Sequence, residues 1–98
     1  MLTLQFTGLI WYWRGPAPWY FVTVPRKHSL ALKALSSVLT YGWGVIPVTA
    51  QIRKTTWTTS LFPRDDLYAL PIKTVVRKAE ELDEGDRVRI EMTTGDPR

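Results

Sequence analysis

Apolar and polar residues alternate at the start of the chain. The alternation over Leu2–Thr7 is typical of a strand with one buried face. The continuous apolar run Leu9–Trp13 fits the same strand entering a region covered on both faces, through a bend at Gly8. Glycine and proline in residues 14–18 predict a turn, and the aromatic and β-branched run Trp19–Val24 predicts a second strand.

The pattern then changes to a helical one. Leucines and helix-favouring residues over Ser29–Leu39 predict a short helix, with Ser29 as its N-cap. Alternation returns over Val45–Ile52, which predicts a third strand, and Pro47 within it indicates an edge or a bulge.

The second half of the chain repeats this order. Thr56–Phe62 predicts a strand with Trp57, Thr59 and Leu61 on one face, and with Lys54 and Arg64 flanking it in solvent. A turn separates it from a short strand over Leu67–Leu70, which ends at Pro71.

Apolar positions with helical spacing mark the next segment. Ile72, Val75, Val76 and Ala79 predict a second short helix over Ile72–Glu81. Residues 87–92 alternate charged and apolar positions, which predicts a last strand that we expect at an edge, and residues 93–98 read as a frayed polar tail.

The two halves therefore share one order of elements: strand, strand, proline, helix, glycine turn, strand. Pro25 in the first half corresponds in this reading to Pro71 in the second. Two such halves related by a pseudo-twofold axis would close a barrel and leave no free edges. The sequence predicts a mainly β fold, a single domain over residues 1–98, built as a six-stranded double-split β-barrel from two ββαβ halves with two short helices.

Several motifs resemble a known family. Residues 68–82 with the following Gly85-Asp86 look like the proline, helix, Gly-Asp and strand unit of AbrB-type swapped-hairpin proteins. Across nearly the whole chain, Trp19–Pro25, Gly42–Val48 and Thr55–Pro63 resemble an uncharacterised prokaryotic domain-of-unknown-function family. This resemblance implies a double-split β-barrel, sometimes fused to a YdeI/OmpD-associated domain, and implies no particular activity.

The composition limits the kinds of metal site and active site that the chain can contain. The 98 residues are 45% hydrophobic and 22% charged, which is ordinary globular composition. The absence of cysteine excludes disulfides, thiolate metal sites and a cysteine nucleophile, and His28 is the single histidine. Five tryptophans exceed what a small barrel interior needs, so we expect most of them in the core or barrel wall and one or two on the surface as a contact site.

Charge is divided unevenly along the chain. The first sixty residues contain no acid and six basic residues, and the net charge of the whole chain is +4. Such a field attracts polyanions, although the cations are scattered and form no dense cluster. The basic residues of the first half are Arg14, Arg26, Lys27, Lys33, Arg53 and Lys54.

Two acidic motifs are better explained by structure than by chemistry. Asp65 and Asp66 follow a proline and are typical turn formers. The acidic run 80–86 lacks the ligand spacing of a calcium loop and fits a helix end followed by a turn. Neither motif predicts a metal site.

Gly42-Trp43-Gly44 is the most specific local motif, because two glycines permit close backbone approach and can present the ring between them. Trp43 either closes one end of the core or faces a ligand. The candidate binding residues from the sequence are Trp43, Arg26, Lys27, Arg53, Lys54 and Arg64.

These observations predict a binding role without catalysis. The preferred interpretation is a module that binds a small ligand or a protein partner, and the alternative is a module that binds nucleic acid weakly through scattered cations. We expect no cofactor, no metal and no membrane partner, a cytoplasmic location because the N-terminus lacks a basic leader, and a monomer.

Overall fold

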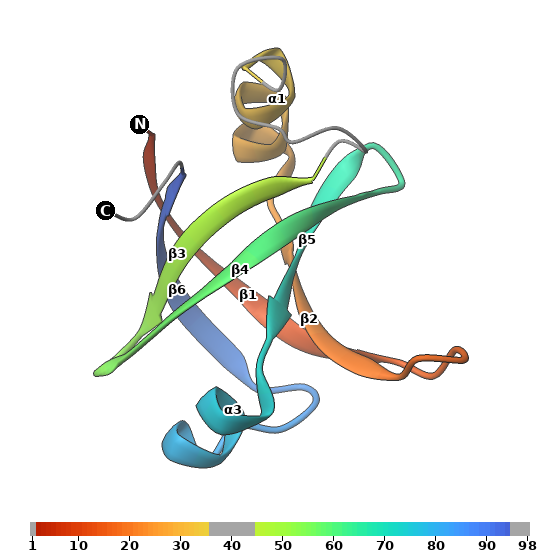
Figure 1. Cartoon of the computed structure of the whole chain (residues 1–98), viewed down its shortest axis with the longest axis vertical. Coiled ribbons are helices and arrows are strands. Elements are labelled where there is room, and N and C mark those ends of the chain that lie inside the picture. Colours follow the sequence, from red (N-terminus) through yellow and green to blue (C-terminus); the bar gives the residue numbers. More distant parts are fainter. Residues whose placement is uncertain (1, 36–44, 95–98) are drawn as a thin grey trace.

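In the computed structural model, residues 2–35 and 45–94 are described, and they contain six antiparallel strands and two helices (Figure 1). The strands close into a barrel, as predicted. The strands are β1 (Thr3–Trp13), β2 (Trp19–Val24), β3 (Ile46–Ile52), β4 (Thr55–Arg64), β5 (Leu67–Ile72) and β6 (Arg87–Thr94), and the helices are α1 (Arg26–Ala34) and α3 (Thr74–Glu80).

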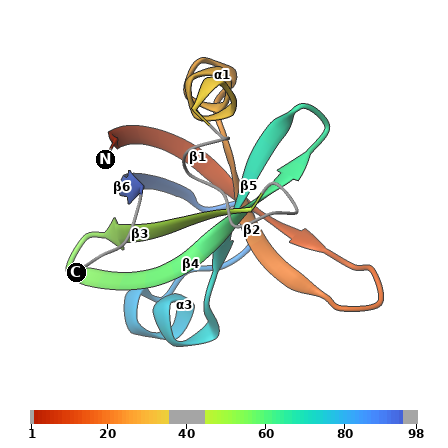
Figure 2. The same ribbon diagram turned by 45° about the horizontal axis from the view of Figure 1, so that its top comes forward.

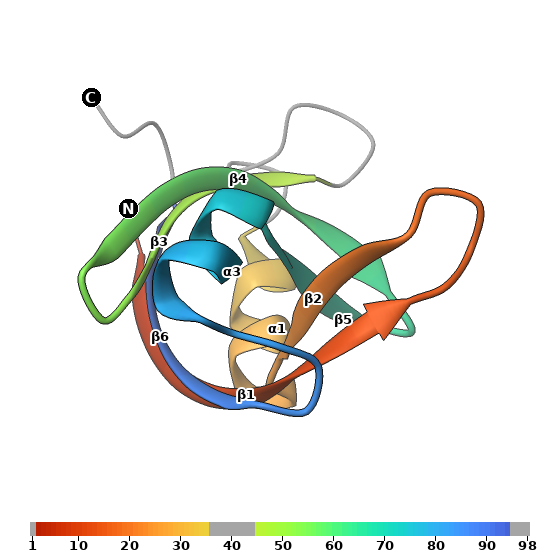
Figure 3. The ribbon, with the colours of Figure 1, turned by 90° about the horizontal axis from the view of Figure 1, so that it is seen from below.

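The strand order confirms the predicted repeat. Around the barrel the strands follow β1-β2-β5-β4-β3-β6, and exchanging the two halves leaves every pair of neighbours unchanged. The helices lie at opposite ends of the barrel, and α3 lies across the end that faces away from α1 (Figures 1 and 3). The alignment of Pro25 with Pro71 was wrong, because the residues that precede the helices are Pro25 and Lys73.

Gly8, where the alternating pattern was predicted to end, lies next to the point at which β1 changes its pairing partner from β6 to β2. β1 pairs with β6 through Leu9 and with β2 from Ile10 onward. A Cβ atom on Gly8 would lie 2.7 Å from the Cγ1 atom of Val22, so glycine lets β1 approach β2 closely at this point.

Both helix starts differ from the prediction. α1 begins at Arg26, because Pro25 supplies the helix-compatible φ and lacks an N–H that a first turn would leave unpaired. Ser29 is therefore not the N-cap but a buried residue inside the helix. Residues 36–39 of the predicted helix lie outside the described residues.

The second helix begins at Thr74, and Ile72 belongs to β5, where pairing with β2 keeps the chain extended. Its apolar face was also misassigned. Val76 is buried, whereas Val75 is 68% exposed and Ala79 is exposed, because a helix of seven residues turns only one narrow side to the barrel.

Four predictions about strand edges and strand ends were wrong, because pairing around the closed barrel continues past the positions that local patterns marked. β3 and β6 pair with each other as well as with their other neighbours, so neither is an edge. Pro47 is tolerated in β3 because the pairing with β6 begins only at Val48. Thr94 is buried within β6 rather than frayed, and Pro71 lies inside β5 opposite Phe21.

The barrel interior is filled by the inward residues of all six strands. Trp57 and Leu61 point inward, as predicted, while Lys54 and Arg64 are exposed. The indole Nε1 of Trp57 donates a hydrogen bond of 3.1 Å to the carbonyl oxygen of Pro71, which ties β4 to β5 across the core.

Two hairpins extend beyond the closed part of the barrel. The β1–β2 and β4–β5 hairpins project on the same side of the molecule (Figures 2 and 3). The β2–β5 pairing joins them into one four-stranded sheet, β1-β2-β5-β4, whose outer face is available for function.

Candidate functional site

Aromatic side chains gather on the outer face of this four-stranded sheet. Alternation along β1 and β2 buries Ile10 and Val22. The residues on either side of them, Trp11 on β1 and Phe21 on β2, therefore face outward. The register then places Trp11 opposite Phe21, and Trp13 opposite Trp19. Four rings from two strands thus lie on one surface.

The β4–β5 hairpin extends this surface. Phe62 on β4 is 48% exposed and lies opposite Ala69 on β5. Because β5 runs between β2 and β4, its small Ala69 and flat Pro71 leave a depression between the larger rings on either side. We call the surface formed by Trp11, Trp13, Trp19, Phe21 and Phe62 the aromatic face.

Two neighbouring hollows occupy the aromatic face, and Phe21 and Phe62 line both. The first has a volume of about 290 Å³ and the second about 520 Å³. The first is lined by Trp11, Trp13, Phe21, Phe62, Pro63, Arg64 and Ala69. The second is lined by Ala17, Pro18, Trp19, Phe21, Thr59, Phe62, Pro71 and Lys73.

Part of the aromatic face is held in place by polar contacts. The Trp11 indole donates a hydrogen bond of 2.9 Å to the Thr23 hydroxyl and stacks on Phe21 with ring centroids 5.0 Å apart. The guanidinium of Arg64 lies 5.0 Å from the centre of the Trp11 ring, a cation–π contact. Trp13 and Trp19, each 39% exposed, remain open to a ligand.

The opposite side of the β1–β2 hairpin fixes it against α3. The guanidinium of Arg77 lies 3.7 Å from the centre of the Tyr20 ring, which in turn contacts Tyr12. Arg14 covers the Tyr12 ring and pairs with Glu84 at 3.0 Å. The hydrogen bond from Arg14 to Glu84, and then their charge attraction, raise the pKa of Arg14. This stack gives the aromatic face a fixed position relative to the barrel.

The structure separates the basic residues that the sequence singled out. Arg26 and Lys27 lie in the first turn of α1, while Arg53 and Lys54 form the β3–β4 turn toward the other end of the barrel (Figure 1). Only Arg64 of these candidates lines the aromatic face. Trp43 lies outside the described residues.

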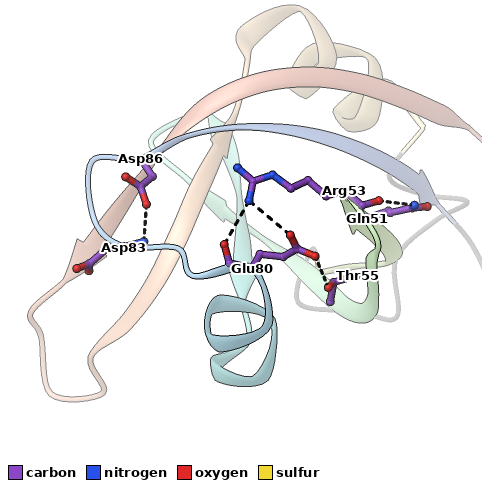
Figure 4. Close-up of polar contacts among 6 residues, drawn as sticks. All are labelled: Gln51, Arg53, Thr55, Glu80, Asp83 and Asp86. Carbon is purple, nitrogen blue, oxygen red and sulfur yellow. Dashed lines mark hydrogen bonds and ion pairs between the residues drawn. The ribbon is translucent and has the colours of Figure 1, made fainter.

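Arg53 takes part in a structural contact between the β3–β4 turn and α3 (Figure 4). Its Nη1 lies 3.3 Å from the carbonyl oxygen of Glu80 and 3.5 Å from the Glu80 carboxylate. The Thr55 hydroxyl donates a hydrogen bond of 2.6 Å to the same carboxylate. This hydrogen bond and then Arg53 lower the pKa of Glu80. The arrangement ties the turn to the helix.

The acidic motifs and the histidine also have structural positions. Asp65 and Asp66 form the β4–β5 turn with φ of 51° and 66°, and an Asp86 carboxylate oxygen accepts a hydrogen bond of 2.8 Å from the Asp83 N–H (Figure 4). The His28 Nε2 lies 3.2 Å from the Gln5 carbonyl oxygen. Within the described residues, no three His, Asp or Glu side chains are placed to hold a metal ion together.

The pattern of residues along the chain does not locate the aromatic face, although the composition contains a signal for it. The surplus of tryptophan indicated that one or two rings lie on the surface, and among the described tryptophans Trp13 and Trp19 are exposed. The alternation that turns Trp57 and Leu61 inward also turns Phe62 outward, but no local pattern shows that Phe62 lies beside the β1–β2 rings.

Comparison with known proteins identifies one family. A family model described as a domain of unknown function, DUF1905, matches residues 6–92. A search of curated proteins found no match. None of the helices in the described part of the chain has the length and apolar character needed to cross a membrane.

Proposed function

The chain belongs to the DUF1905 family, and we propose that it is a binding domain that holds the apolar part of a ligand on its aromatic face. The observation that supports this most directly is the exposure of Trp13, Trp19 and Phe62 beside two hollows on one sheet. Large apolar groups gathered on a protein surface mark sites of contact with ligands or other proteins.

A binding role without catalysis also agrees with the residues around the hollows. The side chains that line them are mostly apolar, with Arg64 and Lys73 as their charged members. General acid–base catalysis most often uses a histidine or a carboxylate at the reacting atoms, and among the described residues neither lines the hollows. A guanidinium and an amine at a surface serve better to attract an anionic group on a ligand.

Binding of nucleic acid is the weaker of the two interpretations. Duplex binding draws its affinity from many phosphate contacts on one surface. Here Arg26 and Lys27 lie apart from Arg53 and Lys54, and neither pair lies on the aromatic face. We expect any nucleic-acid affinity to be weak and to fade near physiological ionic strength.

The test uses the full chain labelled with ¹⁵N and two small probes, 2-naphthoate and the neutral 2-naphthalenemethanol. Both probes should shift the indole N–H signals of Trp13 and Trp19, which single Trp→Phe variants assign. Trp19→Ala should weaken binding of both probes. Thr58→Ala is the matched control, because Thr58 is exposed on β4 and lines neither hollow. Probes that bind elsewhere, or do not bind, would refute the proposal.

A further inference from the structure

We propose that the occupant of the aromatic face is an extended segment of a partner protein, with two bulky apolar side chains flanked by acidic residues. This inference rests on the proposed function and names the ligand class. It follows from the position of the hollows, from their arrangement and from the charge at their rims.

The position of the hollows favours a polypeptide over an enclosed small molecule. Small-molecule sites usually surround most of the ligand surface. In this barrel the interior is occupied by fully buried side chains such as Ile10, Val22 and Leu61, and the hollows lie on the outside of the sheet. A segment that lies along the surface fits an open site of this kind.

The arrangement of the hollows favours two side chains from one segment. The hollows are neighbours, since Phe21 and Phe62 line both. In an extended peptide, residues i and i+2 point to the same side, about 7 Å apart. One apolar side chain would contact Trp11 and Trp13, and the next would contact Trp19 and Pro71. Recognition of alternate side chains by adjacent pockets is a recurring mode of peptide binding.

The charge at the rims defines the flanking residues. Arg64 lines the first hollow and Lys73 the second, and among the described residues no carboxylate lines either. Among the described residues, Arg64 pairs with the carboxylate of Asp65 at 3.8 Å. The Asp65 side chain is 88% exposed, so this surface pair is weak and the guanidinium can change partner. Opposite charges on the segment would complement both rims.

The same charges disfavour two other occupants. A second copy of the chain that docked through the same face would bring Arg64 and Lys73 against like charges, in a protein whose net charge is already +4. A single-stranded nucleic acid would need a cationic groove along its backbone as well as the stacking rings. The aromatic face supplies one cation for each hollow, which suits two acidic side chains better than a chain of phosphates.

The experiment measures binding of fluorescein-labelled peptides to the full chain by anisotropy. The first peptide has the order glutamate, glutamate, tryptophan, serine, leucine, glutamate, glutamate. The second replaces every glutamate with lysine. We expect the acidic peptide to bind about tenfold more tightly, as two surface ion pairs would produce. The Arg64→Glu, Lys73→Glu double variant should reverse this preference. Lys54→Glu, a charge reversal at a residue that lines neither hollow, should leave the preference in place.

Four other outcomes of these measurements would overturn the inference. Equal affinity for the two peptides, or tighter binding of the lysine peptide, would overturn the charge argument. Tighter binding of an oligothymidylate of eight nucleotides than of the acidic peptide would replace the polypeptide with a nucleic acid. If no peptide binds while the naphthyl probes still shift Trp13 and Trp19, this inference fails and the proposed function stands. If neither class of probe binds, both fail.

Discussion

Replacing Trp57 by alanine tests whether the barrel core supports the aromatic face. Trp57 is 6% exposed and donates its indole hydrogen bond to the Pro71 carbonyl oxygen. Pro71 in turn lies opposite Phe21 and lines the larger hollow. The substitution therefore removes core volume and a support of the binding surface together.

The expected loss follows from two contributions. Truncation of a buried tryptophan to alanine costs about 3–5 kcal/mol of the free energy of unfolding, through lost burial and the cavity left behind. Part of that cost comes from the buried Pro71 carbonyl, because an acceptor left without a donor costs about 1–3 kcal/mol. Trp57→Phe keeps a large ring and removes the donor, so it should show mainly this second contribution.

Urea denaturation followed by far-ultraviolet circular dichroism measures both variants without relying on tryptophan emission. Because domains are stable by only about 5–15 kcal/mol, the alanine variant can fail to fold, and the phenylalanine variant then decides the question. Thr58→Ala, the neighbouring exposed position, should change stability by less than about 0.5 kcal/mol. A loss below about 1 kcal/mol in Trp57→Ala, or none in Trp57→Phe, would refute the reasoning.

Three further variants test separate contacts. Ser29→Ala should cost about 1–3 kcal/mol in urea denaturation, because its buried hydroxyl satisfies two backbone groups; an unchanged midpoint would contradict this. The Thr55 hydroxyl lowers the pKa of Glu80, so this contribution to stability is complete above the ordinary value of 4.5 and is lost as pH falls through the lowered folded pKa. Thermal melts should therefore lose more stability on acidification in the wild type than in Glu80→Gln, and equal losses would count against the contact. Gly15→Ala should displace the Trp13 ring, which lies 2.5 Å from the added Cβ, and so weaken naphthoate binding at unchanged stability; unaltered binding would place the ring elsewhere.

Local patterns were sufficient for much of the architecture. Period-two alternation located the strands, because successive side chains in a strand point to opposite faces. Pro25 and Gly85 delimited elements, since each restricts or frees the backbone at one position, and the order of elements in the two halves predicted the barrel. The start of the first helix was predicted wrongly, because Ser29 is a buried residue that bonds the backbone of β2 and β5 rather than an N-cap, and no local pattern revealed this.

Nonlocal pairing decided the candidate site. Composition alone indicated that some tryptophans must lie outside the core, but it could not say which. Trp13 and Trp19 come together through the β1–β2 register, and Phe62 joins them only because β5 pairs with both β2 and β4. A single strand shows which residues share a face, but the order of strands around the barrel decides which face meets the core. That order dispersed the cations of the first half and brought Arg64 and Lys73 to the aromatic face, because contacts between distant segments, rather than spacing along the chain, set their positions.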